Sequence, residues 1–177
     1  MRALVLAFLL GAGVFYWFNQ PGNDPMTAEQ VPAADLRSYR NIAARQPHPC
    51  EGKKRCLVTY MAPWCGICKS NIPIYQHARS MIRESPDVGV MLVLSPVNRS
   101  WQDHGAVARK IGGRVMLDPH DQAWDNLGSA VNGVPAFVVY NGNGDIENLR
   151  PGGFRTVNKA TAHRMVEDEL KLGSYLH

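Results

Sequence analysis

Short apolar runs alternate along this chain with segments of helical periodicity. Residues 57–62, 88–94 and 136–140 are almost wholly apolar and predict buried strands. Between the first two, apolar residues recur at helical spacing: Ile74, Ala78, Met81 and Ile82. Strands that alternate with helices, followed by a hairpin and a last helix, predict a three-layer α/β sandwich.

Weaker patterns predict the shorter elements. Residues 100–111 and 121–127 are expected to be helical, with a short strand at 114–117 before the second of them. The Asn-Gly-Asn-Gly run at 141–144 predicts a hairpin turn, after which residues 145–149 return as a strand.

Two further helices are predicted at the borders of the domain. Residues 33–45 show a modest helical pattern that places Leu36 and Tyr39 on one side, with Ile42 or Ala43. Thr156 is expected to cap the final helix.

The first eighteen residues predict export. Residues 3–18 are all apolar, aromatic or glycine, Arg2 precedes them, and the first acid, Asp24, follows well after them. This arrangement is typical of a signal peptide or of a retained anchor, and the aromatic cluster at 15–18 favours the anchor. We therefore divide the chain into a signal segment (1–18), a linker with a short helix (19–49) and a domain (50–177).

A CxxC motif lies between the first predicted strand and the helix after it. Cys65 and Cys68 are separated by Gly66 and Ile67. A thiol at a helix start faces unpaired N–H groups and the positive end of the helix dipole, which stabilise a thiolate. Cys65 is thus the candidate nucleophile, and Cys68, one turn deeper, the candidate resolving thiol. A zinc site, which needs a second ligand pair, and a purely structural bridge are the alternatives.

The other two cysteines, Cys50 and Cys56, are close together just ahead of the first core strand. They can form a structural disulfide, a second redox pair, or, with His48, a soft copper site. Spacing alone does not choose among these three.

Composition allows a folded core but no nucleic-acid surface. The 177 residues are 45% hydrophobic, and the net charge is +4. The one basic cluster, at residues 53–55, lacks interleaved aromatic residues, so we expect no nucleic-acid partner.

These motifs together resemble the thioredoxin superfamily, in particular its membrane-tethered TlpA/ResA-like branch. The resemblance rests on residues 52–68 with the CxxC motif, on Pro73, and on the sequence Gly-Val-Pro-Ala at 133–136. The Asp-Pro step at 118–119 and the Asn-Gly-Asp turn at 143–145 also match, so the likeness spans about residues 50–172.

The resemblance implies a fold and an activity. The fold is a thioredoxin-like α/β/α sandwich with a central mixed sheet and a TlpA/ResA-like βα insertion, preceded by the membrane segment. The activity is exported thiol-disulfide exchange on the periplasmic side of a bacterial inner membrane, with no cofactor except the Cys65–Cys68 disulfide and no metal. A protein cleaved after the signal segment would instead be soluble in the periplasm.

The resemblance also implies partners and binding residues. Substrate proteins that carry cysteines would bind at Trp64, Val134 and Pro135, with a cis bond before the proline. A membrane redox partner would recycle the CxxC pair.

Two departures from the family pattern bear on the direction of electron flow. Thr59 stands where thioredoxins carry a buried aspartate, and Asn71 stands where TlpA/ResA-like reductants often carry an acid. The branch favours a reductant. A DsbA-like oxidant or isomerase, which the loop at 134–136 resembles, is the alternative, and a copper-binding chaperone using Cys50 and Cys56 is a further one.

Overall fold

The computed structural model describes residues 33–41, 47–95, 101–112, 114–118, 122–127, 131 and 133–176. The predicted membrane segment and most of the predicted linker lie outside these residues. Within the described ranges, no helix combines the length and the apolar character needed to cross a membrane.

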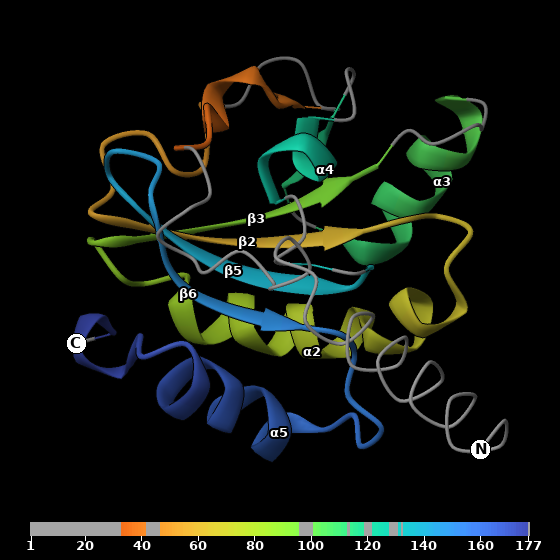
Figure 1. Ribbon diagram of the computed structural model, residues 1–177. Helices are drawn as coiled ribbons and strands as arrows, with labels where there is room; N and C mark the ends of the chain where they lie inside the picture. Colours follow the sequence, from red (N-terminus) through yellow and green to blue (C-terminus); the bar gives the residue numbers. More distant parts are fainter. Residues whose placement is uncertain are drawn as a thin grey trace, which may run out of the picture.

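A six-stranded mixed sheet forms the centre of the domain, in the order β1-β4-β3-β2-β5-β6 (Figure 1). The strands are Arg40–Asn41 (β1), Arg55–Met61 (β2), Val88–Leu94 (β3), Val115–Leu117 (β4), Ala136–Asn141 (β5) and Ile146–Pro151 (β6). β2, β3 and β4 run parallel, while β5 is antiparallel to both β2 and β6, and β1 is antiparallel to β4. The predicted mixed sheet is confirmed.

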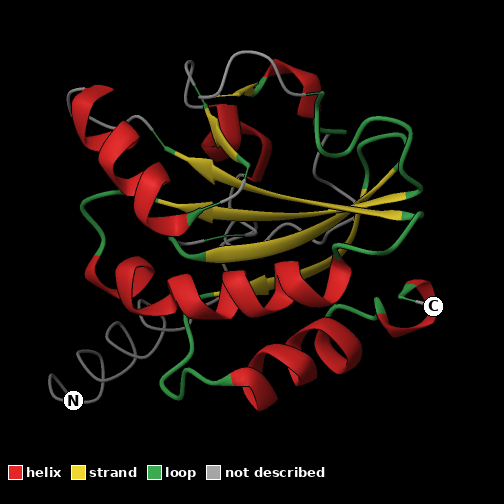
Figure 2. Cartoon of the chain, turned by 180° about the vertical axis from the view of Figure 1, so that it is seen from behind, coloured by secondary structure: helices red, strands yellow, loops and turns green. Residues whose placement is uncertain are grey.

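Helices cover both faces of this sheet. α2 (Gly66–Ile82) and α5 (Lys159–Arg164), which continues as a π-helical segment (Met165–Glu169), lie side by side on one face, as Figure 2 shows from behind. α4 (Gln122–Leu127) and a 3₁₀ turn (Leu36–Ser38) cover the other face, and α3 (Trp101–Ile111) packs near the start of α2. The result is the predicted three-layer sandwich.

The central strands are apolar on both sides because both faces are covered. Residues 56–61 of β2 are all buried, and β5 is buried except at its last residue. This continuous burial fixes the carboxyl end of β2, where the chain leaves the sheet and begins α2.

The prediction of a helix over residues 33–45 is wrong for the part that is described. A single 3₁₀ turn at Leu36–Ser38 is followed by β1, which pairs with β4. Tyr39 provides the reason: its ring is buried, and its hydroxyl lies 3.0 Å from that of Tyr60, which lies 2.9 Å from that of Tyr140. This hydrogen-bonded chain holds the segment in an extended path against the sheet.

The predicted cap of the final helix is also wrong. Asn158, and not Thr156, caps α5, because its side-chain oxygen accepts a hydrogen bond from the Thr161 N–H at 2.8 Å. Both residue types cap helices well, so local sequence preference does not separate them.

Candidate functional site

Cys65 is the N-cap residue of α2, four positions after the end of β2. The Cys68 N–H donates to Cys65 Sγ at 3.1 Å, and the Lys69 N–H donates to the Cys65 carbonyl at 3.1 Å. The sulfur therefore takes the place of the side-chain oxygen that usually caps a helix. A negative charge on this sulfur would face the positive end of α2.

The two thiols differ in access to solvent. Neither is in a disulfide in this structure, and Cys65 is 8% exposed while Cys68 is 2% exposed. Burial raises the pKa of the Cys68 thiol well above its usual range, and its hydrogen bond with Cys65 acts in the same direction. Cys68 is thus held as a neutral thiol behind the more accessible sulfur.

The loop before β5 lies directly against the first thiol. The Val134–Pro135 peptide bond is cis, and the Val134 carbonyl oxygen lies 3.5 Å from Cys65 Sγ, close enough to accept a weak hydrogen bond from the thiol. Pro135 has no N–H to donate, so an incoming chain meets the polar groups on either side of it. Cys65 and the pair Val134 and Pro135, 69 and 70 positions apart in sequence, form one site.

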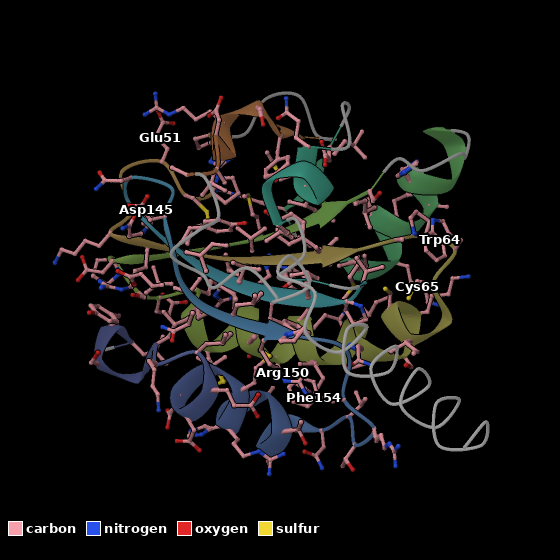
Figure 3. All side chains as sticks on the ribbon, in the orientation of Figure 1. Glu51, Trp64, Cys65, Asp145, Arg150 and Phe154 are labelled. Atoms are coloured by element: carbon pink, nitrogen blue, oxygen red, sulfur yellow. A yellow bond between two sulfur atoms is a disulfide. The ribbon has the colours of Figure 1, made fainter. Side chains whose placement is uncertain are left out.

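Two large apolar side chains are exposed beside the thiols. Trp64 is 48% exposed and Ile67 is 60% exposed, and no other large apolar side chain among the described residues is comparably exposed. Figure 3 shows Trp64 and Cys65 together at the end of the sheet where α2 begins. Exposed apolar residues around a reactive group are typical of a protein-binding surface.

Beneath the site, two buried polar side chains stand where the resemblance led us to look for acids. The Thr59 hydroxyl is buried and makes no hydrogen bond within the described part of the chain. Asn71 is fully buried, and its amide bonds with the backbone of Phe154 and with Ile67. Neither residue can take up a proton from Cys68 as a carboxylate would.

Sequence analysis missed part of the site. Ile67 was treated only as a spacer in the motif, and Asn71 only as a missing acid, whereas Gly153 was not noticed. A Cβ atom on Gly153 would lie 2.5 Å from Ile67 Cγ2, so the segment after β6 approaches the motif closely. A polar residue on the apolar side of the helical pattern was the one available signal, because buried amides need partners.

The second cysteine pair lies at the other end of β2. Cys50 and Cys56 form a disulfide. Within the described ranges, no group of three or more His, Cys, Asp or Glu side chains is arranged to hold a metal ion. His48 nearby is half-buried, and burial lowers its pKa. A copper site on this pair would first require reduction of the bridge.

Comparisons with known proteins agree with this geometry. The thioredoxin family model matches residues 48–111. Over 38 residues the chain is 45% identical to a probable protein disulfide-isomerase A6 of Medicago sativa, a match that spans 22% of this chain and 10% of that protein. The matched residues 48–111 include the CxxC motif, and over this part the chain is similar to thioredoxin. These matches support the predicted resemblance to thioredoxins over the part of the chain that contains the CxxC motif.

Solved structures of disulfide oxidoreductases and thioredoxins share the fold. A secreted Mycobacterium tuberculosis disulfide oxidoreductase homologous to E. coli DsbE superposes with a TM-score of 0.55 at 15% identity, over 75% of this chain and 98% of that one. The exposed lipoprotein thioredoxin Etrx1 of Streptococcus pneumoniae gives 0.56 at 19% identity, over 73% and 96%. At such identities the likeness establishes the thioredoxin fold alone.

Proposed function

We propose that this protein is an exported thiol-disulfide oxidoreductase of the TlpA/ResA-like type, which reduces disulfides in substrate proteins through Cys65 and Cys68. The observation that carries the proposal is the arrangement of the two sulfurs. Cys65 caps α2 beside the Val134 carbonyl and the exposed Trp64, while Cys68 is buried one turn deeper.

The reaction on a substrate disulfide has two steps. The Cys65 thiolate attacks one substrate sulfur, so that a mixed disulfide forms, the substrate disulfide breaks, and the released substrate sulfur takes up a proton. Cys68 then loses its proton to water or to the substrate and attacks Cys65 Sγ, which releases the second substrate thiol. The substrate gains two electrons, and the Cys65–Cys68 disulfide that remains is recycled by a dithiol partner at the membrane.

Burial of Cys68 leaves Cys65 as the sulfur on which a thiolate could stabilise the reduced pair. An oxidant such as DsbA is strong because its reduced form is stabilised. Here burial raises the pKa of Cys68, so ionisation of this sulfur does not stabilise the reduced pair at neutral pH. The direction therefore depends on Cys65, and the likeness to the TlpA/ResA-like branch favours a reductant.

Two features support an exported location. The apolar segment at 1–18 has the charge asymmetry of a signal or anchor segment. The Cys50–Cys56 disulfide fits the same location, because disulfides persist in oxidising compartments.

A trapping experiment in the full chain tests the proposal. Cys68→Ser removes the resolving thiol, so we expect mixed disulfides to accumulate in the exported fraction and to map to Cys65 by mass spectrometry. The matched control, Cys65→Ser with Cys68→Ser, should capture nothing. Equal capture by both variants, or none by either, would refute exchange at Cys65.

The reduction potential of the wild-type pair tests the direction separately. A value near the roughly −270 mV of thioredoxin agrees with a reductant, whereas a value near the roughly −120 mV of DsbA indicates an oxidant.

A further inference from the structure

Asn71 is a fully buried polar residue of α2, three positions after Cys68. Its Oδ1 accepts a hydrogen bond from the Phe154 N–H at 2.8 Å, and its Nδ2 lies 3.3 Å from the Phe154 carbonyl oxygen, to which it donates. Nδ2 also donates to the Ile67 carbonyl at 3.0 Å and to Ser70 Oγ at 3.3 Å. One amide group thus pairs with both backbone groups of a residue 83 positions away.

Phe154 is the last residue of a short segment, residues 151–154, that begins where β6 ends. Pro151 pairs with Ala136, the first residue of β5. The loop at 133–135 therefore enters the sheet at the same paired position at which residues 151–154 leave it. Both segments lie at the end of the sheet that carries the thiols.

Each segment contacts the CxxC turn through a different residue. The Val134 carbonyl oxygen lies 3.5 Å from Cys65 Sγ. On the other segment, a Cβ atom at Gly153 would lie 2.5 Å from Ile67 Cγ2 and 2.9 Å from Asn71 Nδ2, so only glycine allows this approach. The exposed Ile67 side chain is thereby backed by residues 151–154.

Arg150 holds the same segment from the side of the sheet. Its Nη1 donates to the carbonyls of Pro151, at 2.9 Å, and Gly152, at 2.5 Å. Its guanidinium lies 3.6 Å from the centre of the Phe154 ring and pairs with Glu169 at 2.8 Å. Figure 3 labels Arg150 and Phe154 next to each other. Residues 151–154 are fixed at both ends, but only the Asn71 bonds tie their backbone to α2 among the hydrogen bonds of the described residues.

From this geometry we propose that Asn71 is a positioning residue that holds residues 151–154 as a second wall of the substrate-binding surface, beside the wall formed by Val134 and Pro135. The proposal rests on the proposed exchange at Cys65. The role needs an amide, because a carboxylate could accept from the Phe154 N–H but would face two carbonyl oxygens where Nδ2 now donates.

The test compares two substrates of the reduced protein. One is a disulfide-linked peptide with an extended segment long enough to touch both walls, and the other is hydroxyethyl disulfide, which is too small to reach them. For Asn71→Asp we expect kcat/KM on the peptide to fall about tenfold, mainly through KM, which corresponds to the loss of one hydrogen bond. For hydroxyethyl disulfide, kcat/KM should change by less than about twofold, because this substrate does not reach the wall and the change is smaller than the contribution of one hydrogen bond.

A matched control and a second variant keep the test independent of folding. Asn148→Asp makes the same chemical change on β6, away from the contact between Asn71 and Phe154, and should alter neither rate. Gly153→Ala places a Cβ atom against Ile67 and the Asn71 amide, so it should displace the same segment and reproduce the selective loss on the peptide. Hydrogen exchange at the Phe154 N–H should become faster in Asn71→Asp.

The outcomes separate this inference from the proposed function. If both variants slow both substrates equally, or slow neither, Asn71 only stabilises the fold and the positioning role is wrong. If the wild-type protein reduces neither substrate, exchange at Cys65 is wrong and the positioning role is refuted with it.

Discussion

The two cysteine pairs lie near opposite ends of β2 and have opposite surroundings. Cys56 is the second residue of β2, and Cys65 follows the end of the strand. From Cys56 to Met61 the strand spans about 17 Å, so the two pairs do not meet within one chain. One pair is a closed disulfide, and the other is a pair of free thiols.

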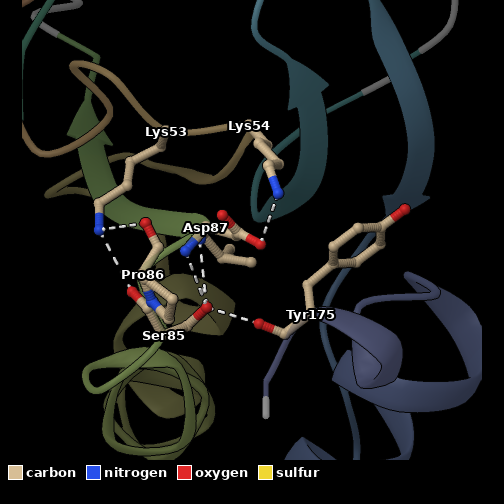
Figure 4. Close-up of polar contacts among 7 residues, drawn as sticks. Lys53, Lys54, Ser85, Pro86, Asp87 and Tyr175 are labelled. Atoms are coloured by element: carbon tan, nitrogen blue, oxygen red, sulfur yellow. Dashed lines mark hydrogen bonds and ion pairs between the residues drawn. The ribbon is translucent and has the colours of Figure 1, made fainter.

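Tightly packed backbone lies against one side of the disulfide. A Cβ atom on Gly89 of β3 would lie 2.5 Å from the Pro49 carbonyl oxygen and 3.1 Å from Cys50 Sγ. Close to this loop, Lys53 Nζ donates to the carbonyls of Ser85, at 3.2 Å, and Pro86, at 2.9 Å (Figure 4).

The C-terminal turn (Gly173–Tyr175) is tied to the same network. Ser85 Oγ donates to the Tyr175 carbonyl at 2.5 Å, and Lys54 pairs with Asp87 at 3.0 Å (Figure 4). These contacts limit the motion of the chain around the disulfide, although Cys50 and Cys56 also line an open cavity.

The CxxC pair has the reverse surroundings. One sulfur caps a helix, and exposed Trp64 and Ile67 stand beside it. We propose that the cysteine pair at one end of the strand is structural and the pair at the other end is reactive, and that packing and helix position account for the difference. Three predictions test this division of roles.

The largest expected effect is on exchange. Cys65→Ser should lower kcat/KM for disulfide reduction by about 10³-fold or more, because the attacking sulfur is removed. The double variant Cys50→Ser with Cys56→Ser should stay within about twofold of wild type, a difference below 0.5 kcal/mol in the barrier. An insulin-reduction assay measures both. A comparable loss in the double variant would show that the Cys50–Cys56 pair takes part in exchange.

The reactive end of the molecule was largely predictable from sequence, because its signals are local. The run of residues 57–62, the CxxC spacing and the following helical periodicity all agree with each other. The hairpin turn at 141–144 is equally local: the Asn141 side-chain oxygen accepts from the N–H groups of Asn143, at 2.8 Å, and Asp145, at 3.0 Å.

What sequence did not predict depends on partners far along the chain. Tyr39 adopts an extended path because its hydroxyl meets that of Tyr60 in a buried chain, which no helical pattern encodes. Asn71 is explained only by Phe154, 83 positions later. Such pairings are tertiary choices that override local propensity.

The next effect concerns stability. Replacing Cys50 and Cys56 together by serine should lower the free energy of unfolding by about 2 to 3 kcal/mol, because the unfolded chain regains the freedom of the closed loop. Urea denaturation measures this as a lower midpoint. The control is the urea midpoint of the wild-type protein in which Cys65–Cys68 is selectively reduced and Cys50–Cys56 stays intact. An unchanged midpoint in the double variant would mean that packing alone fixes this loop.

The smallest effect is a pH dependence of the reduced protein. Burial raises the pKa of Cys68 in the folded state, whereas the unfolded chain releases this proton near the ordinary thiol pKa of about 8.5. The stability that this thiol contributes is therefore fully present below about pH 8.5 and is lost as the pH rises above it.

The comparison of wild type with Cys68→Ser isolates this contribution, because the buried tyrosines are common to both proteins. With Cys65 and Cys68 reduced, wild type should lose unfolding free energy relative to Cys68→Ser by about 1.4 kcal/mol per pH unit between pH 9 and 10. Urea titrations at pH 7, 8, 9 and 10 measure it. A difference that stays constant over this range would show that Cys68 ionises as easily in the folded site as in the unfolded chain, and the contrast between a shielded second thiol and an accessible first one would be lost.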